Sequence, residues 1–141
     1  MNHLKSNVNG VSDSPYNKTV EAVTAARSLS KDDNGKVLLL SGAGVQIDLP
    51  AVADIEAGWN VKAIVNGAVT TANFTVVSAT NVIQGFAIVN GASVAAVNEN
   101  TISFVQAPAD PGDNIEIIFD GTNFLVFGAG VAAGSITFTA P

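Results

Sequence analysis

The hydrophobic residues of this chain fall in short runs with a two-residue period, separated by turn-forming residues. The most regular stretch, residues 115–127, reads IEIIFDGTNFLVF and places two apolar segments around Asp120-Gly121. An Asp-Gly pair accommodates a type I′ turn, whose twist matches that of paired strands, so this stretch predicts a β-hairpin. Apolar residues occupy both alternating sets of positions, which is typical of strands buried on both faces.

The two faces of this hairpin have different expected roles. One face would fill the core of the chain. The other would lie against a neighbouring subunit, and its candidate contact residues are Ile118, Leu125 and Phe127. The hairpin therefore predicts an assembly surface rather than an active site.

The same pattern predicts further short strands along the chain. They cover residues 19–24, 36–40, 45–49, 59–65, 74–77, 81–85, 86–89, 101–106 and 136–138. Residues 24–29 could instead form a helical turn, residues 94–100 an irregular loop or a short strand, and residues 128–134 a flexible segment of small residues. Turn signals separate the strands, including Asn66-Gly67 and Asn90-Gly91, two pairs that favour hairpins.

Many short strands, with turns every ~8–12 residues and no long amphipathic helix, favour an all-β fold. We predict a single-domain antiparallel β-sandwich or jelly-roll-like barrel over residues 19–141. Residues 1–18 are polar and lack hydrophobic periodicity, so they predict a flexible or extended N-terminal arm. The arm is either a disordered tail or a segment that orders against a neighbouring subunit, with Leu4, Val8 and Tyr16 as anchors.

Composition points to self-association. Charged residues make up 13% of the chain and hydrophobic residues 48%, so a monomer would have difficulty covering its surface with polar groups. Subunit interfaces would hide part of that apolar area. The alternative is a monomer whose surface is covered by neutral Ser, Thr and Asn side chains.

Charge and hydropathy also limit the partners. The net charge is −6 with only six Lys and Arg residues, which argues against binding to nucleic-acid phosphates. No apolar run approaches the roughly 18 residues of a membrane-spanning helix, and the first ten residues lack the apolar segment of a signal peptide. The chain has no cysteine, which excludes disulfides and thiolate metal sites.

Catalytic and metal-binding patterns are weak. The single histidine, His3, lies in the predicted arm, where packing would not hold a general base in place. A cation shared by Asp110, Asp113 and Asp120 is conceivable, but Asp in turns usually serves local hydrogen bonds. Trp59 could stack on a sugar, although its alternation with Val61 favours the core. We therefore expect no catalytic, cofactor or metal site, and no enzymatic activity.

Several segments, taken in order, resemble a known class of proteins. They are RSLSKDDNGK at residues 27–36, the strand end VQIDLP at residues 45–50, EAGWNV at residues 56–61, the hairpin DNIEIIFDGTNFLVF at residues 113–127 and GSITFT at residues 134–139. Together they resemble β-rich structural proteins of tailed bacteriophages, most of all capsid decoration (cement) proteins. Phe124 stands where tryptophan is more usual in the pattern, and residues 1–18 lie outside it.

The resemblance implies a homotrimer on the outer surface of a phage capsid. Such a protein binds the major capsid protein where its subunits meet and clamps the shell against the pressure of packaged DNA. It needs no cofactor and contacts neither nucleic acid nor membrane. The alternative implied by the same resemblance is a trimeric tail-fibre or spike module that binds a host surface glycan.

Overall fold

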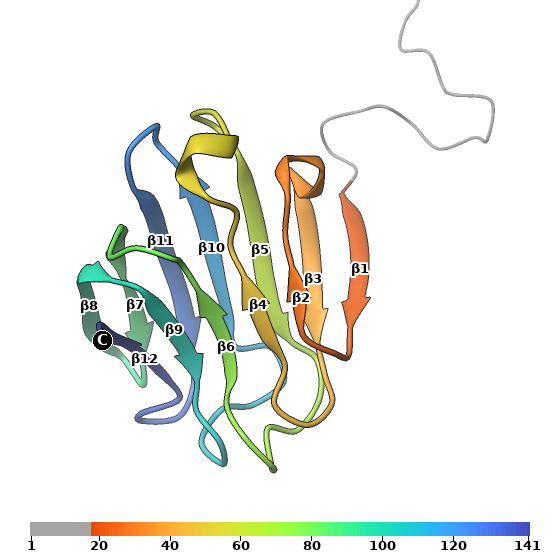
Figure 1. Ribbon diagram of the computed structural model, residues 1–141. Coiled ribbons are helices and arrows are strands. Elements are labelled where there is room, and N and C mark those ends of the chain that lie inside the picture. The colour runs from red at the N-terminus through yellow and green to blue at the C-terminus, as the bar shows by residue number, and fades with distance from the viewer. Residues whose placement is uncertain (1–17) are drawn as a thin grey trace, which may run out of the picture.

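Two β-sheets pack face to face in the computed structural model of the protein, which describes residues 18–141 (Figure 1). Two short 3-10 helices lie in loops between the strands. The elements are β1 (Thr19–Val23), β2 (Arg27–Ser28), η1 (Lys31–Asp33), β3 (Lys36–Leu40), β4 (Gln46–Asp48), η2 (Val52–Asp54), β5 (Asn60–Val65), β6 (Phe74–Val77), β7 (Ile83–Val89), β8 (Ala92–Glu99), β9 (Thr101–Phe104), β10 (Asn114–Phe119), β11 (Phe124–Gly130) and β12 (Ile136–Thr139).

The larger sheet has seven strands in the order β1-β3-β5-β10-β11-β7-β8, and the smaller sheet has five in the order β12-β9-β6-β4-β2. From β1 to β6 the chain alternates between the sheets, so β1, β3 and β5 run parallel in one while β2, β4 and β6 run parallel in the other. Later strands pair mainly as antiparallel neighbours. The predicted all-β sandwich is confirmed, but its strand pairing is mixed rather than antiparallel throughout.

The hydrophobic core lies between the two sheets, as period-two alternation requires of a sandwich. On the larger sheet, the central hairpin contributes Ile115, Ile117, Phe119, Phe124 and Val126, each at most 2% exposed. Trp59 packs edge-on to Phe124 with ring centroids 6.2 Å apart, and Phe119 lies 5.2 Å from Phe124. The smaller sheet supplies fully buried side chains from the opposite side, namely Ile47, Phe74, Ile102, Phe104 and Ile136.

The turn of the β10–β11 hairpin differs from the predicted type I′ turn. Gly121 has a positive φ of 104°, but Asp120 does not, and the loop spans residues 120–123. The Asp120 carboxylate accepts hydrogen bonds from the backbone N–H groups of Thr122 and Asn123, and these bonds lower the pKa of Asp120. A two-residue turn with both φ angles positive occurs instead at Asn90-Gly91, between β7 and β8.

Other predicted boundaries also change. Residues 27–28 form a strand rather than part of a helical turn, and β7 runs without interruption through Gly85. Residues 92–99 form a complete strand, and β11 extends to Gly130 through part of the segment predicted to be flexible. Asn66-Gly67 does not close a hairpin, because β5 and β6 belong to different sheets. None of the helices within residues 18–141 is long and apolar enough to cross a bilayer.

Candidate subunit interface

The outer face of the larger sheet is apolar, although no other part of the described chain covers it. On the central hairpin, Ile118 and Leu125 are each 42% exposed and Phe127 is 47% exposed. Strand register places Ile118 directly opposite Leu125. The sequence predicted this surface at these three residues. The expectation that the hairpin is buried on both faces is wrong within one chain, because only the inward face is covered.

Two further strands extend this surface beyond the hairpin. Phe86 and Ile88 of β7 are 47% and 43% exposed, and Val97 of β8 is 63% exposed. Register pairs Phe86 with Phe127 across the β7–β11 boundary. We call the outer face of β10, β11, β7 and β8 the apolar strip; its large apolar side chains are Phe86, Ile88, Val97, Ile118, Leu125 and Phe127. Two large polar side chains share this face, Glu116 opposite Phe127 and Gln84 opposite Leu125. The sequence did not predict that Phe86, Ile88 and Val97 belong to this surface. The two-residue spacing of Phe86 and Ile88 does place both on one face of a strand.

A charged pair separates the apolar strip from the rest of the sheet. Lys62 of β5 lies directly opposite Glu116 of β10 in the register, and both are half-buried. Beyond them, the outer face becomes apolar again on β1, β3 and β5, where the side chains are Val20, Val37, Leu39 and Ile64. Opposite charges at facing positions stabilise the pairing of two strands, and this pair marks a polar boundary on the outer face. Register also places Asn60, Gln84 and Asn114 on this face.

The outer face of the smaller sheet is polar by contrast. Register aligns Gln46, Thr75 and Thr137 in one row, and Asp48, Thr101 and Thr139 lie in the next row with Val77. Hydroxyl, amide and carboxylate groups remain hydrated at little cost, whereas an exposed sheet of Phe, Leu and Ile favours association. The two outer faces therefore differ in chemistry, and the larger sheet carries the candidate interface.

A cluster of ion pairs ties edge strand β1 to the loop that follows β2. Arg27 pairs with Glu21 and Asp33, and the Lys36 ammonium lies 2.8 Å from Asp33 Oδ1 and 3.3 Å from Glu21 Oε1. Burial of the Asp33 carboxyl opposes its ionisation, but hydrogen bonds from Lys36 and Ser30 and the positive charges of Arg27 and Lys36 outweigh that effect. The pKa of Asp33 is accordingly lowered. These contacts have a structural role, because all four side chains find partners within the cluster.

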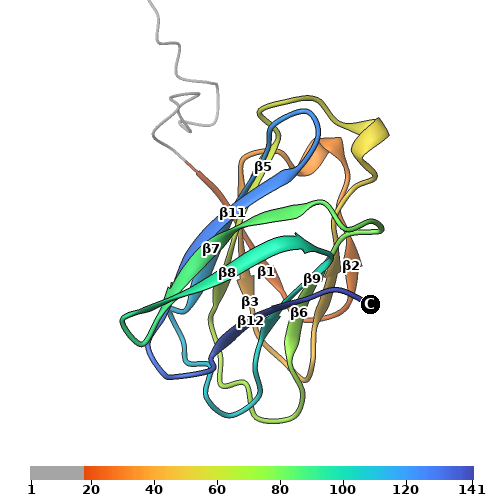
Figure 2. The ribbon, with the colours of Figure 1, turned by 90° about the vertical axis from the view of Figure 1, so that its left-hand side faces the viewer.

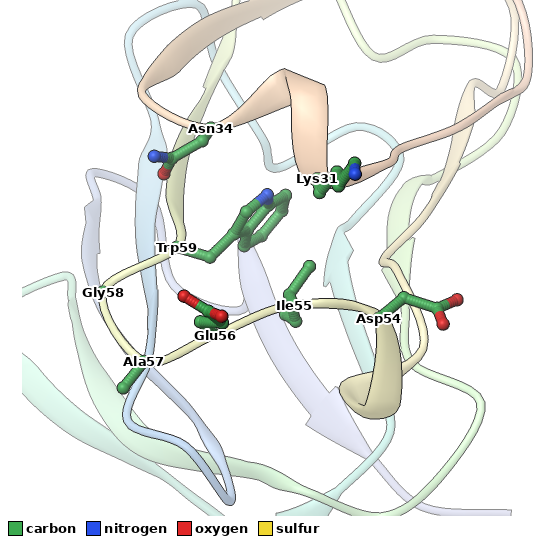
Figure 3. Close-up of a pocket in the computed structure, with 8 residues that line it drawn as sticks. All are labelled: Lys31, Asn34, Asp54, Ile55, Glu56, Ala57, Gly58 and Trp59. Carbon is green, nitrogen blue, oxygen red and sulfur yellow. The ribbon is translucent and has the colours of Figure 1, made fainter.

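A groove at one end of the sandwich is open to solvent (Figure 3). It has a volume of about 610 Å³ and is lined by Lys31, Asn34, Asp54, Ile55, Glu56, Ala57, Gly58 and Trp59. The indole N–H of Trp59 donates to the Ser30 carbonyl at 3.2 Å, and the residue is only 4% exposed. Its ring is therefore part of the core, as its alternation with Val61 predicted, and does not present a stacking face to a sugar.

The structure does not assemble the conceivable cation site. The Asp113 carboxylate accepts backbone hydrogen bonds from Asp110 and Val131, while Asp120 caps its own turn. Strand β10 lies between Asp113 and Asp120. The seven residue steps that separate these two aspartates span roughly 23 Å in an extended strand. Within residues 18–141, no group of three His, Asp or Glu side chains is placed to hold a metal ion.

The predicted arm residues Leu4, Val8 and Tyr16, together with His3, lie outside the described part of the chain. Searches of the chain against protein-family models, curated proteins and solved structures found no match.

Proposed function

We propose that the protein is a structural component of a phage virion. It binds the outer surface of the capsid as a homotrimer, contacts the major capsid protein and stabilises the shell. The observation that carries this proposal is the apolar outer face of a packed β-sandwich, which is suited to permanent association with protein. The segments that resemble decoration proteins supply the virion context, and all of them lie within the strands and connecting loops of the two sheets.

Stabilisation of the shell would follow from mass action. A protein that binds the assembled lattice and not the free capsid subunits lowers the free energy of the lattice by about 2.7 kcal/mol per site at a concentration 100 times the Kd. That mechanism needs a rigid body and a surface for attachment, but no chemical step. With a net charge of −6, the chain would repel rather than bind the packaged DNA.

Co-sedimentation with purified, expanded capsids of the encoding phage tests this function. We expect saturable binding at a stoichiometry fixed by the symmetry of the lattice, and a rise in the temperature at which the capsids open. Bovine serum albumin at the same concentration provides the control for trapping in the pellet. Failure to bind capsids, with binding to host cells that is lost after removal of surface glycans, would replace this proposal by the tail-fibre or spike alternative.

A further inference from the structure

The apolar strip is four strands wide, a width that allows three copies of it to enclose a common axis. We infer that the apolar strips of three copies of this chain face a common axis and form a second hydrophobic core between the subunits. This inference rests on the proposed homotrimer and assigns the surface that builds it. The partner of the strip is thus another copy of the same chain.

The size of the strip fits three copies. Four neighbouring strands about 4.8 Å apart occupy roughly 19 Å, and a triangle with sides of that length places each sheet about 5.5 Å from its centre. Packed sheets lie about 10 Å apart, so each contributes side chains that reach about 5 Å. Three strips would therefore fill the space around the axis. Phe127 and Phe86, which pair on the two middle strands, would lie nearest to it.

The two ends of the sheet are compatible with such a ring. β8 is the last strand of the larger sheet, and within residues 18–141 only β7 pairs with it (Figure 2). The β8 sequence ASVAAVNE contains neither Lys nor Pro, the residues that commonly protect free edges. At the other end, β5, β3 and β1 extend beyond the Lys62–Glu116 pair.

In a three-fold ring this extension would cover the β8 edge of the adjacent copy. The outer residues Val20, Val37, Leu39 and Ile64 would then lie on the side of the neighbour formed by β8 and β12. The contact is of the head-to-tail kind, in which different surfaces of two copies meet and the rotation closes the ring. Both apolar parts of the outer face are thereby covered.

Light scattering coupled to size exclusion tests the surface and the number of copies together. We expect a mass three times that of the 14.3 kDa chain for the wild-type protein. Phe127→Asp and Phe86→Asp should reduce it to the mass of one chain, because each would place a carboxylate at the shared core. Gln46→Asp, on the polar outer face of the smaller sheet and three strands away from β12, is the matched control and should retain the trimer.

Crosslinking provides a test that does not depend on the stability of a separated subunit. The natural chain has no cysteine, so Phe127→Cys or Gln46→Cys introduces a single thiol per chain. A short bismaleimide should join two Phe127→Cys chains in high yield and leave Gln46→Cys chains unlinked. A wild-type monomer or dimer, or a trimer in which Phe127→Cys does not crosslink, would overturn the inference. Loss of capsid binding by an intact, crosslinkable trimer would instead overturn the proposed function alone.

Discussion

Replacement of Gly85 by alanine should be unusually destabilising for a half-buried strand position. Gly85 lies within β7 with a φ of 138°, a backbone conformation that side chains rarely adopt. A Cβ atom built there would lie 1.9 Å from the carbonyl oxygen of Val126 on the adjacent strand β11. Because the obstructing atom belongs to the backbone, no side-chain rotation can relieve the clash, and the β7–β11 pairing would have to shift.

Two costs add in this variant. The unfavourable backbone conformation costs about 1–3 kcal/mol, and displacement of a packed neighbour costs roughly as much again. We therefore expect Gly85→Ala to lower the free energy of unfolding by about 2–6 kcal/mol. For a chain of this size, each kcal/mol shifts Tm by about 2–4 °C, so Tm should fall by roughly 10 °C.

Gly91→Ala is the matched control, since Gly91 also has a positive φ, of 77°, but no atom lies within 4 Å of the added Cβ. It should lose only the conformational cost, about 1–2 kcal/mol. Thermal unfolding followed by circular dichroism, at equal protein concentration for all variants, measures the difference. A Tm for Gly85→Ala that equals or exceeds that of Gly91→Ala would refute the close approach of β7 to β11.

Three further predictions concern the core, the ion pairs and the N-terminus. Phe124→Ala should cost about 3–5 kcal/mol in urea unfolding, because the fully buried ring packs against Trp59 and Phe119; a cost below 1 kcal/mol would contradict that packing. The pKa of Asp33 lies below its ordinary value of 3.8, so its ionised form stabilises the fold above that pH and the stabilisation is lost as pH falls through the lowered pKa. Asp33→Asn should therefore be less stable at pH 7 and show a flatter decline in stability below about pH 4, as urea titrations across pH will measure; an unchanged pH profile would argue against the cluster. If the proposed function holds, deletion of the predicted arm, residues 1–18, should weaken capsid co-sedimentation and leave the mass from light scattering at three truncated chains; unchanged binding would remove the arm from the attachment site.

The sequence predicted the local strands better than their pairing. β3 and β6 occur at the predicted residues, since each is a short apolar run between clear turn signals. The alternation of apolar and polar residues shows which side chains share one face of a strand, but it does not show which strands are neighbours in the sheet. The parallel pairing of β1, β3 and β5 could therefore not be inferred from the sequence.

Glycine was the main source of boundary errors. Gly128 was expected in a flexible segment, yet a Cβ there would lie 2.1 Å from the Asn114 carbonyl oxygen, so the residue permits close packing of β11 on β10. Gly85 has the same role between β7 and β11 and does not interrupt the strand. The sequence did not clearly predict strand β8 for a related reason: its many Ala and Ser side chains give only a weak pattern of alternating hydrophobicity.

The candidate interface was predictable on the hairpin and not beyond it. Ile118, Leu125 and Phe127 followed from alternation within one continuous stretch of sequence. Phe86, Ile88 and Val97 join them only because β7 and β8 follow β11 in the sheet, a long-range arrangement that the pattern does not encode.

The most direct test of the proposed function is the binding of the purified protein to expanded capsids of a tailed phage that carries its gene, quantified by co-sedimentation over a range of protein concentrations. The proposed structural role on the outer shell predicts saturation at three chains per lattice site, with tight binding by the wild-type protein. An absence of saturable binding to those capsids, by a protein that is folded and trimeric, would contradict it.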